Sequence, residues 1–185
     1  MKILFPIIII AILFVISCDK NPVIQNEEEL ITEFKYTLVP RNGGSTSTFT
    51  FMDLDGEGGL PPDITSDTLM SGVVYDGKLS LLNVYSDVIQ NITGEIKNEG
   101  DAHQFFYESS GELSDKLSVV YNDADINNNP IGIITVITTT GTGTGNLKIT
   151  LRHEPNKSAV GVTSGIITNA GGETDIEVTF NVIVQ

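Results

Sequence analysis

The feature that most constrains the fold of this chain is a period-two alternation of apolar and polar residues, which is most regular near the C-terminal end. In residues 174–185 the apolar positions Ile176, Val178, Phe180, Val182 and Val184 alternate with Asp175, Glu177, Thr179 and Asn181. Successive side chains of a strand point to opposite faces of a sheet. The pattern therefore predicts a half-buried strand whose apolar set faces the core and whose polar set, Asp175 included, faces solvent.

Comparable segments recur along the chain and are separated by residues typical of turns. Strands are expected in residues 30–38, 48–52, 71–75, 78–82, 104–107, 117–121, 131–138, 146–153 and 160–168. Residues 53–68 predict a loop, Asp76-Gly77 is typical of a two-residue type I′ turn, and residues 84–97 fit a strand or a short helical turn. About eight to ten short strands without a long helix predict an all-β fold, either an antiparallel β-sandwich of immunoglobulin-like architecture or a flattened barrel.

The N-terminal segment predicts where the protein is located. Lys2 precedes an apolar run over residues 3–14, and Ser17 precedes Cys18, the only cysteine of the chain. This order is typical of a bacterial lipoprotein signal peptide over residues 1–17, which is cut before Cys18 so that its sulfur can carry acyl chains such as palmitate. An uncleaved membrane span is the alternative, but residues 3–17 fall short of the roughly 20 residues that a spanning helix needs.

The remaining chain is expected to form a flexible acidic tether over residues 18–29, followed by a single β-sandwich domain over residues 30–185. The expected location is the bacterial cell envelope, with the membrane bound through the lipid on Cys18. The formal net charge of −14 argues against nucleic acid and against anionic lipid as partners, because both are bound mainly through Lys and Arg.

Two loops place oxygen-bearing side chains at alternate positions, which is a pattern that can bind calcium. These side chains are Asp53, Asp55 and Glu57 in one loop, and Asp123, Asp125 and Asn127 in the other. An EF-hand is excluded in both, because its twelfth position requires a glutamate and is occupied here by Ile64 and Ile134. A looser Ca²⁺ site and a plain solvated turn both remain open, since Asp and Asn are also common in tight turns.

The two histidines are the candidate ligands for a transition metal or for haem iron. His153 continues the inward phase of Leu147, Ile149 and Leu151, and His103 stands at the start of another expected strand. If the fold brings both to one end of the sandwich, they can share a metal ion. The alternative is a strand-end histidine that is hydrogen-bonded to a backbone carbonyl.

No segment of the chain carries a recognisable enzyme motif, although paired carboxylates for hydrolysis have no sequence pattern by which to find them. The expected function is therefore a non-catalytic, lipid-anchored envelope protein that binds or displays an unknown protein or glycan through the loops at residues 53–68, 98–102, 123–130 and 154–158. The alternatives are a metal or haem capture lipoprotein using His103 and His153, and a calcium-stabilised adhesion or glycan-binding module.

Five segments carry a resemblance to a known group of proteins. They are residues 101–107 (DAHQFFY), 121–125 (YNDAD), 129–132 (NPIG), 151–157 (LRHEPNK) and 171–176 (GGETDI). Together they resemble a group of short Bacteroidota lipoproteins that are often labelled periplasmic-binding-fold-like and have no assigned activity. The resemblance implies an envelope location and supplies no site residues. The strand pattern contains no alternation of strands and helices, so the fold prediction stays all-β.

Overall fold

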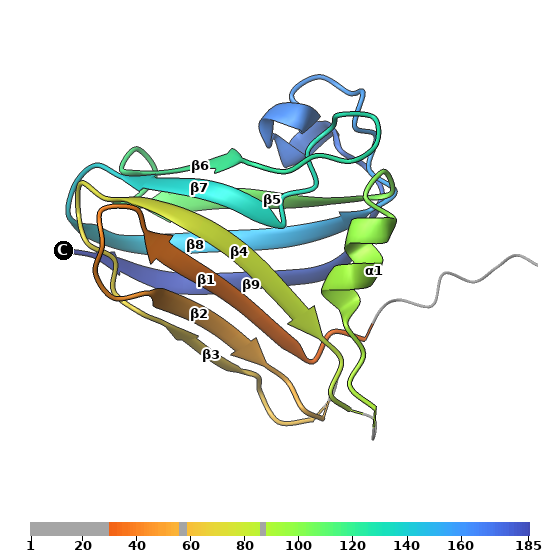
Figure 1. The fold of residues 1–185 in the computed structure, drawn as a ribbon, viewed down its shortest axis with the longest axis horizontal. Helices are drawn as coiled ribbons and strands as arrows, with labels where there is room; N and C mark the ends of the chain where they lie inside the picture. The colour runs from red at the N-terminus through yellow and green to blue at the C-terminus, as the bar shows by residue number, and fades with distance from the viewer. Residues whose placement is uncertain (1–29, 56–58, 86–87) are drawn as a thin grey trace, which may run out of the picture.

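The structure is a computed structural model that describes residues 30–55, 59–85 and 88–185. Two antiparallel sheets pack face to face (Figure 1). The six-stranded sheet has the order β3-β2-β1-β4-β7-β6, and the three-stranded sheet has the order β5-β8-β9. The strands are β1 (Glu33–Pro40), β2 (Ser47–Met52), β3 (Asp63–Ser66), β4 (Val74–Leu82), β5 (His103–Gly111), β6 (Leu117–Tyr121), β7 (Ile134–Thr139), β8 (Gly143–His153) and β9 (Glu173–Val184). The predicted all-β sandwich is thus confirmed.

The core lies between the two sheets and is filled by aromatic side chains from both. Phe34 of β1 and Phe49 of β2 pack against Phe180 of β9, with ring centroids 5.9 and 5.5 Å apart. All three rings are fully buried. Burial of these large aromatic side chains removes apolar surface from water and so stabilises the packing of the two sheets.

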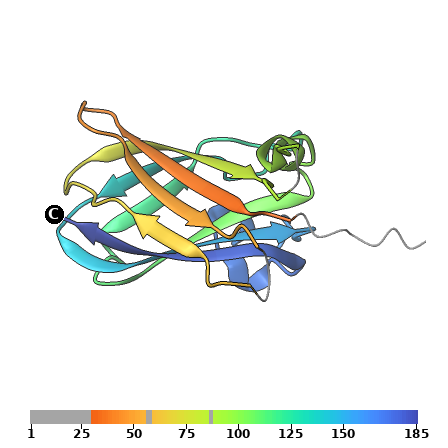
Figure 2. The same ribbon diagram turned by 90° about the horizontal axis from the view of Figure 1, so that it is seen from below.

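The open sides of the sandwich are joined by hydrogen bonds from side chains. On one side, Ser66 Oγ of β3 donates to the carbonyl oxygen of Asn181 in β9, and the two strands lie side by side in Figure 2. On the other side, Ser109 Oγ of β5 donates to the carbonyl oxygen of Leu117 in β6, at 3.2 Å. Backbone hydrogen bonds cover the same strand edges, such as those from the Leu69 N–H to the carbonyl oxygen of Ile183 and from the Phe105 N–H to that of Ile131.

The prediction of a turn at Asp76-Gly77 is wrong, because both residues lie in the middle of the continuous strand β4. Gly77 pairs with Leu38 on one side and Thr135 on the other. A Cβ atom at Gly77 would lie 2.6 Å from the hydroxyl oxygen of Tyr36 and would also collide with Thr135 Oγ1. Glycine is required here for close approach of neighbouring strands, and the Asp-Gly pair alone does not reveal that requirement.

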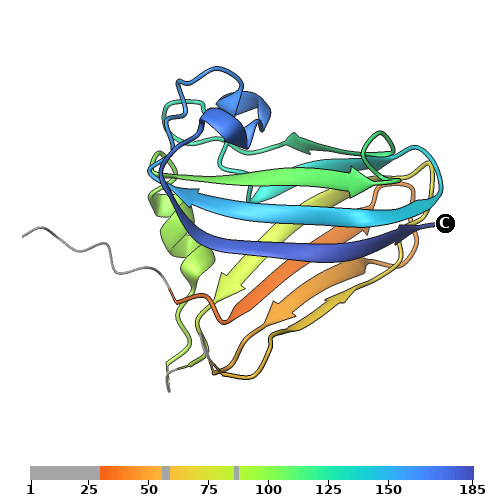
Figure 3. The same cartoon turned by 180° about the vertical axis from the view of Figure 1, so that it is seen from behind.

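Two further predictions differ from the structure. Residues 53–68 are not entirely a loop, because β3 pairs there with β2. The expected strand at residues 160–168 is replaced by two short 3₁₀ helices, η1 (Val162–Ser164) and η2 (Ile167–Asn169). These belong to the connection between β8 and β9, which lies against one end of the sandwich in Figure 3 and covers the outward-facing side chain of Phe106.

The ambiguous segment before β5 forms one short helix, α1 (Ile92–Asn98). Asn91 caps it by accepting a hydrogen bond from the backbone N–H of Gly94, and Ile92 and Ile96 anchor it on the core. Within the described part of the chain, none of the helices has the length and apolar character needed to cross a membrane.

Candidate metal centre

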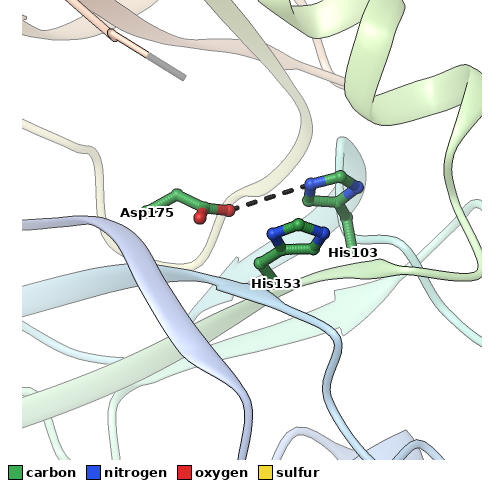
Figure 4. A group of neighbouring side chains, drawn as sticks. All are labelled: His103, His153 and Asp175. Carbon is green, nitrogen blue, oxygen red and sulfur yellow. Dashed lines mark ion pairs between the residues drawn. The ribbon is translucent and has the colours of Figure 1, made fainter. Parts of the chain in front are cut away.

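The two histidines meet because the strands that carry them are direct neighbours in register. His103 begins β5 and His153 ends β8, and the two are cross-strand partners. Directly opposed residues of an antiparallel pair have Cβ atoms only about 4.5–5.5 Å apart. Their imidazole rings accordingly stack, with centroids 4.7 Å apart and planes 8° from parallel (Figure 4). The inward direction predicted for His153 is confirmed.

Asp175 completes the group, and a β-bulge brings it there. Leu151 of β8 pairs with Ile176 of β9, but the next residue, Arg152, pairs with Thr174. Asp175 is therefore an extra residue in β9, and such a residue changes the direction of its side chain relative to regular alternation. The side chain of Asp175 is only 4% exposed and lies beside His103. The prediction that Asp175 faces solvent is wrong for this reason.

A glycine just before β9 explains how the irregular start of this strand can lie so close to β8. Gly172 has a φ of 69°, a left-handed conformation that favours glycine. A Cβ atom at this position would collide with the carbonyl oxygen of His153, so the backbone of Gly172 can approach β8 only because it has no side chain. The glycine pair that precedes β9 is thus the one sequence signal that could have indicated an irregular strand start.

Hydrogen bonding determines which nitrogen of His103 is available. His103 Nδ1 lies 3.0 Å from the carbonyl oxygen of Glu99, at the end of α1. A carbonyl oxygen can only accept, so Nδ1 carries the proton and donates it. The other nitrogen, Nε2, lies 3.8 Å from Asp175 Oδ2. This distance is too long for a direct hydrogen bond.

The three residues offer nitrogen and oxygen atoms of the types that bind zinc, and these atoms lie close together. One ligand atom from each of His103, His153 and Asp175 can be chosen so that all lie within 4.8 Å of one another. Tetrahedral zinc with bonds of about 2.1 Å places its ligand atoms about 3.4 Å apart. The pair between His103 Nε2 and Asp175 Oδ2, at 3.8 Å, is close to that spacing. A backbone carbonyl that holds the distal nitrogen of a histidine, as Glu99 does, is the usual second contact of a metal-binding histidine.

Haem fits this arrangement poorly. Two axial histidines must approach the iron from opposite faces of the macrocycle. Here the rings of His103 and His153 stack directly on each other, and the side chain of His103 is only 2% exposed. The arrangement therefore favours a single small ion over a macrocycle.

The second acidic loop is occupied by hydrogen bonds from within the chain. Asp123 accepts from the backbone N–H groups of Gly132 and Ile134, at 2.7 and 2.9 Å. Asp125 accepts from the backbone N–H groups of Asn127 and Asn129, at 2.8 and 2.9 Å. Asn127 thus contributes its backbone N–H to the loop, as a donor to Asp125. The carboxylates of Asp123 and Asp125, which were candidate calcium ligands, thus accept hydrogen bonds from the backbone of their own connection.

A lysine ammonium lies where a cation would bind in this loop. Lys157 Nζ donates to Asp125 Oδ2 at 3.0 Å, to the carbonyl oxygen of Pro130 at 3.0 Å and to that of Gly100 at 2.5 Å. Burial acts to raise the pKa of Asp125, but the hydrogen bonds from Lys157 and from the Asn129 and Asn127 backbone outweigh it, so this pKa lies below its ordinary value. The positive charge of Lys157 thus lies beside the Asp125 carboxylate, in the loop for which a Ca²⁺ site and a plain turn were the two alternatives.

Lys157 also joins three of the four loops that were predicted to form a binding face. Its contacts connect residues 98–102, 123–130 and 154–158. Beside them lies a cavity of about 520 Å³, lined among others by Lys97, Ile126 and Ile131. The fourth predicted loop, residues 53–68, lies at the β2–β3 connection instead.

The remaining predicted residues lie either in the loop after β2 or outside the described part of the chain. Asp55 Oδ2 accepts from the backbone N–H of Leu60 at 2.9 Å. Asp53 lies in the same loop, at the end of β2. Glu57 and Cys18, together with the predicted signal peptide and tether, lie outside the described residues. Within residues 30–55, 59–85 and 88–185, His103, His153 and Asp175 are the group with metal-binding spacing.

No family model, curated protein or solved structure matches this chain. The function proposed below rests on the residues and contacts of this chain alone.

Proposed function

We propose that this chain is a lipid-anchored protein of the bacterial envelope whose β-sandwich binds one divalent transition metal ion of the zinc class. His103, His153 and Asp175 would hold the ion, and acyl chains on Cys18 would hold the protein at the membrane. The observation that carries this proposal is the opposition of His103 Nε2 and Asp175 Oδ2 at 3.8 Å in a buried place.

The physical reason is electrostatic. With the proton of His103 on Nδ1, the Nε2 atom presents a lone pair toward a carboxylate oxygen. A nitrogen lone pair and a carboxylate oxygen that face each other at low exposure form a favourable place for a positive charge. A metal ion supplies that charge, and the nitrogen and oxygen ligands suit zinc in particular. Protonation of His103 is the competing source of positive charge.

The burial of the group supports retention of an ion over turnover of a substrate. The side chains of His103 and Asp175 are 2% and 4% exposed, so only a small species reaches them. Catalytic zinc sites keep an open position that a substrate can approach. A non-catalytic role, in which the protein captures or is stabilised by the ion, fits this burial better.

Isothermal titration calorimetry of the lipidated chain in detergent with Zn²⁺ tests the proposal. We expect one site per chain with micromolar or tighter affinity. Asp175→Asn keeps the shape of the side chain and removes its charge, and should weaken Zn²⁺ binding at least tenfold, which corresponds to about 1.4 kcal/mol. His153→Gln should weaken it comparably. Glu173→Gln is the matched control, because Glu173 is the cross-strand partner of His153, is exposed and belongs to the same strand as Asp175.

Two results would refute a metal role. One is Zn²⁺ binding no tighter than millimolar. The other is equal affinity in the Asp175→Asn and Glu173→Gln variants. Circular dichroism of each variant shows whether it is folded, and the intact mass of the purified chain shows separately whether Cys18 carries lipid.

A further inference from the structure

The two loops that follow β2 and β4 expose apolar side chains at their ends. These apolar loop tips are Leu54, Leu60, Tyr85, Val88 and Ile89, each between 57% and 77% exposed. Single exposed apolar residues are normal, but a group at one end of a domain needs a separate explanation.

The register of the six-stranded sheet places both loops at the end where the chain enters the domain. Glu33, at the start of β1, pairs with Met52 at the end of β2 and with Leu82 at the end of β4. The loops that begin after Met52 and Leu82 therefore flank the first residues of the domain. Figure 1 shows the same arrangement, with the connections after β2 and β4 next to the start of β1.

Thr32 joins these three pieces through hydrogen bonds. Its carbonyl oxygen accepts from the N–H of Asp53 at 2.8 Å, and its own N–H donates to the carbonyl oxygen of Leu82 at 3.1 Å. Its hydroxyl oxygen accepts from the N–H of Val84 at 2.8 Å. Thr32 is fully buried. The bases of both loops are thus held in a fixed position relative to the point where residues 18–29 join the domain.

We infer that the apolar loop tips rest on the neutral part of the lipid bilayer to which Cys18 anchors the chain. This inference rests on the lipid anchor in the proposed function. Residues 19–29 span at most about 40 Å, at about 3.6 Å per residue, so this end of the domain stays close to the bilayer. Because the anchor makes docking intramolecular, burial of a few apolar side chains is enough to orient the domain.

The chemistry of the loops selects uncharged lipid as the partner. Residues 53–62 and 83–91 contain no Lys or Arg, and the chain has a net charge of −14. Attraction to anionic headgroups is therefore absent, and the contact depends on apolar side chains and on Tyr85, whose ring suits the interface between headgroups and acyl chains. His103 begins β5 and His153 ends β8, and Figure 3 shows these strand ends on the same side of the sandwich as the start of β1.

The absence of tryptophan from the chain allows a direct test. A Tyr85→Trp variant of the lipidated full-length mature chain is inserted through its anchor into nanodiscs of phosphatidylcholine, with or without bromine on the acyl chains. We expect bromine to quench the fluorescence at least twofold and the emission maximum to shift to the blue. The matched control is Thr142→Trp, an exposed position in the turn between β7 and β8 at the opposite end. It should show neither effect.

Three outcomes would overturn the inference, and they are distinguishable. Equal quenching at both positions shows that the domain has no preferred face toward lipid. If the Tyr85→Trp variant cosediments with the nanodiscs but is not quenched, the anchor is intact and the loop tips do not contact lipid. The loop tips are then assigned to a protein partner. Failure to cosediment refutes the anchor and the docking that rests on it. Adding Val88→Asn and Ile89→Asn to the Tyr85→Trp variant should remove the quenching while the chain still cosediments.

Discussion

The ammonium of Lys157 lies 3.0 Å from Asp125 Oδ2, and their side chains are only 6% and 1% exposed. Lys157 belongs to the connection between β8 and β9, and Asp125 to the connection between β6 and β7. A buried ion pair whose charges are also satisfied by backbone groups is costly to break, because the remaining charge stays buried without its partner. The pair joins these two connections.

Replacement of Lys157 should therefore be strongly destabilising. Lys157→Met removes the charge and leaves the Asp125 carboxylate buried, and we expect the free energy of unfolding to fall by about 3–5 kcal/mol. Urea denaturation followed by circular dichroism measures the change. The control is Lys116→Met, since the Lys116 ammonium donates to the carbonyl oxygen of Thr142 at an exposed place and should contribute no more than about 1 kcal/mol. Equal losses in the two variants would contradict the role assigned to the buried pair.

The same carboxylate should make the fold sensitive to acid. The pKa of Asp125 lies below its ordinary value in the folded state, because the hydrogen bonds from Lys157 and the backbone outweigh the effect of burial. A lowered pKa contributes stability that is present above the unfolded pKa of about 3.9 and is lost as the pH falls through the folded pKa. Wild-type stability should drop between pH 4 and pH 2 by more than that of Asp125→Asn, whose amide does not titrate there. Urea midpoints at pH 7, 4 and 2 give the comparison, and parallel losses in both proteins would assign acid sensitivity to other carboxylates.

The bulge at Asp175 should depend on Gly172. Gly172→Ala introduces a Cβ atom that collides with the carbonyl oxygen of His153, in addition to the cost of a φ of 69°. We expect a loss of about 2–4 kcal/mol and weaker Zn²⁺ binding, because the start of β9 must shift away from β8. Gly171→Ala is a close control: its φ is 59°, but nothing lies within 4 Å of the added Cβ. It should lose only about 1 kcal/mol and keep its Zn²⁺ affinity. Thermal unfolding and calorimetry measure both effects.

The candidate site was only partly predictable. The inward direction of His153 follows from the alternation of β8, and both histidines stand at strand ends in the sequence. Their juxtaposition, however, depends on β5 and β8 being neighbours in one register, which no local pattern states. Asp175 was assigned to the wrong face because period-two alternation assumes a regular strand, and one extra residue reverses the phase of what precedes it. No pattern in the sequence indicated the role of Lys157, because its partners lie at distant positions in the chain.

The sequence by itself determined the class of fold, because alternation of apolar residues is a local property and every strand that buries one face must show it. The hairpin of β1 and β2 and the long final strand follow directly from it. Only the tertiary structure decided what the special residues do. Gly77 permits close strand approach where a turn was predicted, Asp125 pairs with Lys157 in a loop whose role was left open, and Asp175 turns toward His103. Each of these depends on which distant residue lies opposite, and that is set by which strands become neighbours in a sheet and by how the connections pack.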